Sequence, residues 1–91
     1  MRYLLSYDIS KNQKRYRVAK LFEEFGCWRI QKSVYYFEGS ESKLELLRQN
    51  LIGFFRNESL VIVPVEQRML KNIVYIGARV GERARKELIF I

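Results

Sequence analysis

The sequence predicts an α+β domain in which one antiparallel sheet carries two helices on a single face. Three observations lead to this prediction. Short apolar segments alternate with period two, two longer segments repeat their apolar residues with helical period, and the first four of these elements alternate as strand, helix, strand, helix. A chain of 91 residues has the size of one small domain, so we expect residues 1–91 to fold as a unit.

The first predicted strand is RYLLSYDI, residues 2–9, because it is rich in aromatic and aliphatic residues and too short for a helix. Side chains of a strand alternate between two faces. One face of this strand would carry Tyr3, Leu5, Tyr7 and Ile9, and the other Leu4, Ser6 and Asp8.

A helix is predicted to follow, with Ser10 as its N-cap and Gln13 as the capping-box partner. Gly26 is suited to the residue just beyond its end. The apolar stripe that would face the sheet consists of Val18, Leu21, Phe22 and Phe25.

The segment CWRIQKSVYYFEG, residues 27–39, is predicted to be one long second strand. Two sets of side chains alternate along it: Trp28, Ile30, Val34 and Tyr36 on one face, and the more polar Arg29, Gln31, Ser33 and Tyr35 on the other. The stretch GSES then opens a second helix, whose apolar stripe would be Leu44, Leu47, Leu51 and Phe54 or Phe55.

Three further strands are predicted at residues 59–65, 72–78 and 87–91. Pro64 donates no ladder hydrogen bond, which favours a break in the pairing there. The terminal ELIFI is apolar and needs a sheet edge, which a neighbouring subunit could offer.

The simplest compact arrangement places both helices on one face of the sheet, as in ferredoxin-like folds. The other face would then be open and half apolar, which is typical of a surface that meets a partner. Its residues are expected to be Ser6, Asp8, Gln31 and Ser33, beside Leu4 and Tyr35.

The chain is basic, with a net charge of +7. A charge this high in a small domain favours nucleic acid as a partner, although it also serves solubility. Four basic residues, Lys11, Lys14, Arg15 and Arg17, lie in or just before the first half of the first helix, and Lys20 follows them. The helix dipole disfavours cations near its start, so phosphate binding is indicated more than a merely solvated face. Arg29, Lys32 and the C-terminal Arg79, Arg83, Arg85 and Lys86 would extend this basic surface.

Several kinds of site are excluded by composition. The chain has one cysteine, Cys27, and no histidine, so it forms no internal disulfide and lacks the commonest general base. We expect a reduced, cytoplasmic protein without a leader segment and without a membrane partner, since no apolar run is long enough to span a bilayer.

Asp8 is the only aspartate of the chain, and two interpretations of it remain open. It could begin the turn and help to cap the first helix. Alternatively, two copies of Asp8 could meet across the axis of a two-fold dimer and hold one Mg²⁺ against a phosphodiester, as in metal-assisted hydrolysis.

Three stretches taken together resemble a known family: YDIS at the end of the first strand, KRYRVAKLFEEFG, and RIQKSVYYFEG. They are similar to the CRISPR-associated endonuclease family of the spacer-acquisition machinery, the second numbered member of these proteins, here called the Cas-two family. The resemblance covers nearly the whole chain. This chain differs from many members of the family at Lys11 and Asn12, where acidic residues are common.

The resemblance implies a ferredoxin-like fold and a symmetric homodimer in which the C-terminal strand of each chain completes the partner's sheet. It also implies a magnesium ion held by paired Asp8 residues, with Tyr7 beside this catalytic site. The residues that would bind or orient nucleic acid are Lys14, Arg15, Arg17, Arg29, Lys32, Ser33 and Tyr35.

The function implied by the resemblance has two parts. Members of the family are assigned metal-dependent cleavage of single-stranded RNA or duplex DNA. They also act without catalysis, as a dimer that holds duplex DNA and bridges subunits of the CRISPR integrase during spacer acquisition. A toxin-like RNase of the related virulence-associated protein D group is the alternative.

Overall fold

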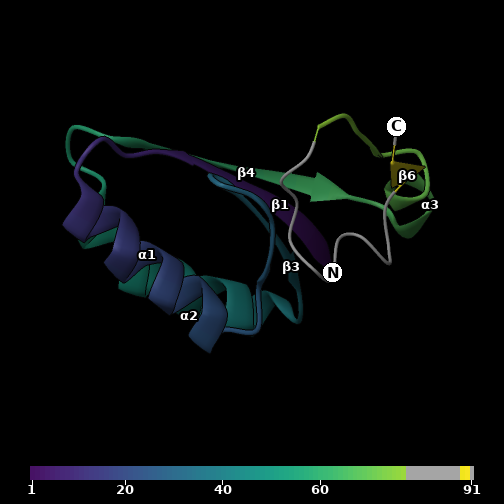
Figure 1. The fold of residues 1–91 in the computed structure, drawn as a ribbon. Coiled ribbons are helices and arrows are strands. Elements are labelled where there is room, and N and C mark those ends of the chain that lie inside the picture. Colours follow the sequence, from purple (N-terminus) through teal and green to yellow (C-terminus); the bar gives the residue numbers. More distant parts are fainter. Residues whose placement is uncertain (78–88, 91) are drawn as a thin grey trace.

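The computed structural model describes residues 1–77 and 89–90. Its main sheet has the strand order β2-β3-β1-β4, and every neighbouring pair is antiparallel. This confirms the α+β, ferredoxin-like class (Figure 1). The elements in chain order are β1 Arg2–Asp8, α1 Asn12–Glu24, β2 Trp28–Gln31, β3 Val34–Glu38, α2 Glu41–Leu51, the 3₁₀ helix η1 Ile52–Phe54, β4 Ser59–Val65, α3 Gln67–Leu70, β5 Val74–Tyr75 and β6 Ile89–Phe90.

Helices α1 and α2 lie side by side on one face of the main sheet, as predicted (Figure 1). The core between them and the sheet is built from the apolar stripes of both layers. Its side chains with no more than 1% exposure are Leu5, Val18, Phe22, Phe37, Leu47 and Leu51. The alternation predicted for residues 2–9 is confirmed, because Leu5, Tyr7 and Ile9 are buried while Ser6 and Asp8 are exposed.

The two helices begin differently. The backbone N–H of Lys43 donates to Ser40 Oγ over 3.1 Å, which confirms GSES as the start of α2. For α1 the predicted cap at Ser10 is wrong. The buried side chain of Ile9 holds the chain against the core after β1, and the N-cap falls on Lys11, whose side chain makes no capping hydrogen bond.

Residues 27–39 form a hairpin of two strands instead of one strand. The turn lies at residues 32–33, and the register shifts between Arg29 and Gln31. Because Tyr35 pairs with Leu5 of β1, its side chain lies on the helix-covered face, so its predicted place on the open face is wrong.

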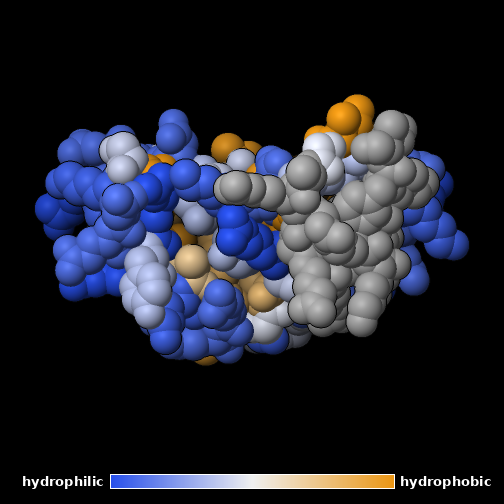
Figure 2. All heavy atoms as spheres, viewed as in Figure 1, coloured by the Kyte–Doolittle hydropathy of each residue, from blue (hydrophilic) through white to orange (hydrophobic). Residues whose placement is uncertain are grey.

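One end of the open face is covered by the same chain. Ile30 and Tyr36 are buried there, and the segment from Val65 to Tyr75 supplies part of the cover. The partly buried side chains packed on them are Leu4, Trp28, Val34, Val65, Leu70, Ile73 and Tyr75. At the other end, Ser6, Asp8 and Val61 remain exposed, and apolar atoms project from the edge along which β4 runs (Figure 2).

The last strands also differ from prediction. β4 continues through Pro64, which pairs with Tyr3, so no break occurs there. β4 is an edge strand of the main sheet, where a residue without an N–H is tolerated. The strand predicted at residues 72–78 is reduced to β5, and β6 pairs with β5 in the same chain. The rest of the predicted terminal strand, together with Arg79, Arg83, Arg85 and Lys86, lies outside the described residues.

Candidate nucleic-acid interface and Asp8

Asp8 is the last residue of β1, where it pairs with Ser59 of β4. Its side chain is exposed on the open face of the sheet. Within the described part of the chain the carboxylate makes no ion pair and no hydrogen bond. The structure therefore gives no support to a capping role, since Lys11 occupies the cap position of α1.

Tyr7 ties the end of β1 to the turn of the β2–β3 hairpin. Its backbone N–H donates to the Ser33 carbonyl over 3.0 Å, and its hydroxyl donates to the Lys32 carbonyl over 3.4 Å. Consequently the predicted residues Lys32 and Ser33 lie next to Tyr7 and Asp8, as a nucleic-acid site at this end of the sheet requires.

A shallow cavity of ≈ 290 Å³ lies on the helix side of the same end, between α1 and the hairpin. We call it the basic hollow, because three of its lining residues are cationic and none is acidic. It is lined by Tyr7, Asn12, Arg15, Tyr16, Ala19, Arg29, Lys32 and Tyr35. The hollow thus brings together five of the predicted site residues, in an arrangement suited to phosphate oxygens.

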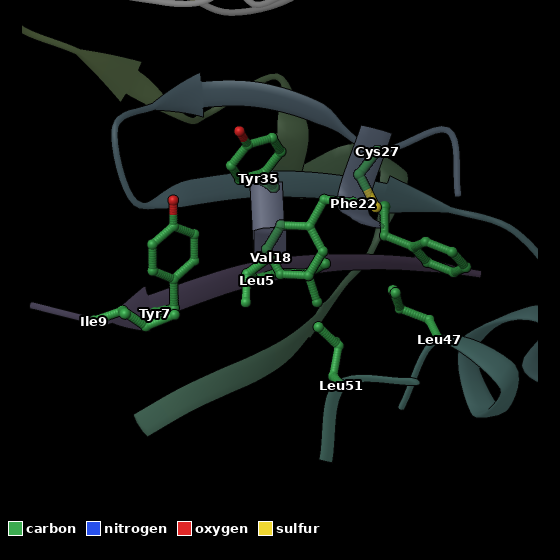
Figure 3. Packing of buried hydrophobic residues seen from close by; sticks show 10 residues of the cluster. Leu5, Tyr7, Ile9, Val18, Phe22, Cys27, Tyr35, Leu47 and Leu51 are labelled. Carbon is green, nitrogen blue, oxygen red and sulfur yellow. The ribbon is translucent and has the colours of Figure 1, made fainter. Parts of the chain in front are cut away.

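Two buried tyrosines form the floor of the basic hollow. Their ring centroids are 6.4 Å apart, and Figure 3 shows the hydroxyls of Tyr7 and Tyr35 pointing the same way, away from Leu47 and Leu51. Burial raises the pKa of both hydroxyls, although Arg29 opposes the effect for each of them. Both tyrosines therefore stay protonated at neutral pH and are poorly suited to act as a base. The Tyr7 hydroxyl already donates to the Lys32 carbonyl, so Tyr35 is the one of the two that can donate a hydrogen bond to a ligand.

The remaining predicted cations do not reach the basic hollow. Successive residues of an α-helix are about 100° apart, so Arg17 points about 200° away from Arg15. Lys14 contacts Glu58 instead: its Nζ lies 3.0 Å from Glu58 Oε1. Hydrogen bonding to Lys14 holds the pKa of the Glu58 carboxyl below its ordinary value. The roles predicted for Lys14 and Arg17 remain predictions.

Three lining residues, Asn12, Tyr16 and Ala19, were missed by sequence reasoning. Asn12 and Tyr16 share one side of α1 with Arg15 and Ala19. Their spacing, i, i+3, i+4 and i+7, is the signal that could have found them, because it marks one face of a helix as clearly as an apolar stripe does.

The side chains present could bind a metal ion only if two copies of the chain share it. Among the described residues no three carboxylate, cysteine or histidine side chains come together as a metal centre. Asp8 is nevertheless an exposed hard-oxygen ligand, and Mg²⁺ commonly takes one or two carboxylates together with water and phosphate oxygens. Two copies of Asp8 would fit that requirement.

In a single chain, Asp8 and the basic hollow lie at the same end of the sheet but on opposite faces. Tyr7 points into the hollow and its neighbour Asp8 points away from it. The predicted site is therefore two adjoining surfaces, one carrying the carboxylate and one carrying the cations. Within residues 1–77 and 89–90, no helix is long and apolar enough to cross a membrane.

Known proteins match the part of the chain that carries both surfaces. The family model described as CRISPR associated protein Cas2 matches residues 1–73, which include Asp8 and every lining residue of the basic hollow. The chain is 35% identical over 79 residues to "CRISPR-associated endoribonuclease Cas2 1" of Archaeoglobus fulgidus, covering 85% of this chain and 84% of the relative. It is 31% identical over 81 residues to "CRISPR-associated endoribonuclease Cas2" of Korarchaeum cryptofilum, covering 85% of each chain.

The fold is similar to that of a solved structure, the hypothetical protein TT1823 from Thermus thermophilus. The TM-score is 0.64 at 29% sequence identity, and the match covers 71% of this chain and 80% of the other. The extent of the family match and the identity to the two archaeal relatives lead to one assignment. This chain belongs to the CRISPR-associated Cas2 family.

Proposed function

We propose that the chain acts as a homodimeric, Mg²⁺-dependent nuclease of the CRISPR system, with one Asp8 from each copy at a shared metal site. The observation that carries this proposal is the exposed carboxylate of Asp8, which has no partner among residues 1–77 and 89–90 and lies beside a cationic surface. An exposed aspartate that neither caps a helix nor pairs with a cation is free to bind a metal ion. RNA is the first substrate to test, because both archaeal relatives are named endoribonucleases.

The roles of the chain's own residues follow from their chemistry. When bound, a divalent cation supplies Lewis acidity to a phosphoryl oxygen and lowers the pKa of a water molecule. Asp8 contributes an oxygen ligand. Arg15, Arg29 and Lys32 offset phosphate charge, and the protonated Tyr35 hydroxyl orients a phosphate oxygen as a hydrogen-bond donor, while the Tyr7 hydroxyl keeps its bond to the Lys32 carbonyl.

A second candidate function needs no catalysis. The basic residues of α1 lie on more than one side of the helix, with Arg15 in the hollow and Arg17 exposed elsewhere. This distribution favours contacts along a phosphate backbone. It supports binding of duplex DNA, and the family suggests that a dimer holding such DNA bridges integrase subunits during spacer acquisition. We place either activity in the cytoplasm, where proteins commonly carry a free cysteine, such as Cys27, and disulfides are rare.

The test uses labelled RNA and duplex DNA, each with Mg²⁺ or with EDTA. Wild type is expected to cleave RNA only with the metal, and Asp8→Asn to lose cleavage while keeping its fold and its nucleic-acid binding. Glu24→Gln is the matched control, since Glu24 is an exposed carboxylate at the far end of α1. Cleavage that survives in Asp8→Asn refutes the nuclease proposal. If neither protein cleaves but both hold duplex DNA equally, the bridging function remains.

A further inference from the structure

We propose that Tyr16 is a base-stacking residue, which makes the basic hollow a site for an unpaired nucleobase of a single strand. This inference rests on the proposed function, because it deepens the assignment of the same surface to nucleic acid. It adds a residue and its role: Tyr16 is the stacking group, and it would favour strands with unstacked bases over a duplex.

The exposure of Tyr16 is the first observation. Its side chain retains 64% of its accessible surface, and it is the one large aromatic side chain exposed to this extent within the described residues. It lies two residues before the buried Val18, so helical geometry directs it away from the core. Apart from a contact with Lys20, packing within the described part of the chain therefore gives no reason for an aromatic ring at this position.

The surroundings of the ring are the second observation. Tyr16 lines the basic hollow together with Arg15, Arg29 and Lys32, and Lys20 Nζ lies 5.7 Å from its ring centroid. Asn12, one helical turn earlier, adds an amide that can both donate to and accept from a base edge. An exposed ring among phosphate-binding cations is the combination that single-strand binding surfaces use.

The geometry favours a single strand over a duplex. In a duplex both faces of each base are covered by neighbouring bases, whereas loops and single strands present open base faces to aromatic side chains. Arg15, Arg29 and Lys32 could bind the phosphates that flank a base stacked on Tyr16. A duplex could use the same cations but could not use the ring.

The experiment measures equilibrium binding in EDTA, so that it is independent of cleavage. The probes are a labelled oligouridine strand, a duplex of equal length, and a strand of the same backbone without bases. The proteins are wild type, Tyr16→Ala and Tyr16→Phe, with Ile52→Ala as the control that removes another exposed apolar side chain, 76% exposed, outside the basic hollow.

Tyr16→Ala is expected to weaken oligouridine binding by about 5- to 150-fold, the range for loss of one base–aromatic stack. Tyr16→Phe should restore it, and binding of the duplex and of the baseless strand should match wild type. The inference is overturned if Tyr16→Ala binds oligouridine as wild type does, if it weakens all three probes equally, or if wild type does not bind the single strand. None of these outcomes depends on Asp8, so the nuclease proposal is tested separately by cleavage.

Discussion

At the scale of single residues, the two sides of one strand end carry different chemistry. Tyr7 and Asp8 are neighbours in the chain, yet one is buried against the core and the other is exposed on the open face. Strand alternation alone produces this separation. It means that a substitution at Asp8 removes a charge without opening a cavity, so loss of cleavage in Asp8→Asn can be interpreted chemically.

Cys27 shows the opposite case, a reactive group made inert by its position. The thiol is buried, and this burial raises its pKa to about 12. At pH 8 only about one thiol in ten thousand would be ionised, and the thiolate is the reactive form. We expect iodoacetamide to label native protein far more slowly than protein unfolded in urea. Equal labelling rates in the two states would show that Cys27 is accessible and would contradict the buried assignment.

At the scale of elements, helix α1 is joined to the segment before β4 by the Lys14–Glu58 ion pair. Lys14 lowers the pKa of Glu58 from its ordinary value of 4.5, so the ionised carboxylate stabilises the folded state. This contribution is present in full above pH 4.5 and is lost as the pH falls through the lowered folded-state value. Glu58→Gln should therefore lower the free energy of unfolding at pH 7, and the difference from wild type should shrink below pH 4.5.

Urea unfolding of both proteins across this pH range measures the effect. Glu45→Gln is the control, because Glu45 pairs with Arg48 but keeps 53% of its side-chain surface exposed, against 11% for Glu58. An exposed pair contributes less to stability, so the control should change little. A Glu58→Gln defect that is as large at pH 3 as at pH 7 would rule out the charge as its cause.

The elements also show what sequence reasoning can and cannot determine. The alternation in β1 and the Ser40 cap of α2 were predicted correctly, because each depends on local chemistry. The hairpin was missed because its turn carries no glycine, proline or asparagine, and because Trp28, Ile30, Val34 and Tyr36 keep the same parity through the turn. The face of Tyr35 depends on its pairing with Leu5, a long-range register that no local pattern encodes.

The candidate site was predictable in composition but not in arrangement. Basic residues near the start of α1, on β2 and in the turn after β2 indicated phosphate binding, and three of them meet in the basic hollow. Sequence reasoning grouped Arg15 with Arg17, which helical geometry separates, and it left Lys14 without its partner Glu58, which lies on a distant segment. That Asp8 and the cations lie on opposite faces could be recognised only from the pairing of the strands in the sheet.

At the scale of the whole molecule, the net charge of +7 favours nucleic-acid binding, and the number of phosphates that contact cationic side chains sets how this binding responds to salt. Each phosphate neutralised by a cationic side chain releases counterions, and the slope of log K against log salt changes by about 0.9 per contact on duplex DNA. Arg29 lines the basic hollow, so Arg29→Gln should reduce this slope by about 0.9 and weaken binding to all sequences alike.

Arg68→Gln is the matched control, since Arg68 Nε already lies 2.7 Å from Glu66 Oε2 at an exposed position on α3. Binding isotherms at several salt concentrations should give the same slope for Arg68→Gln as for wild type. If both variants lower the slope equally, binding depends on total charge and not on the hollow. If Arg29→Gln alone lowers it, nucleic acid contacts the surface formed where α1 meets the β2–β3 hairpin, next to the face that carries Asp8.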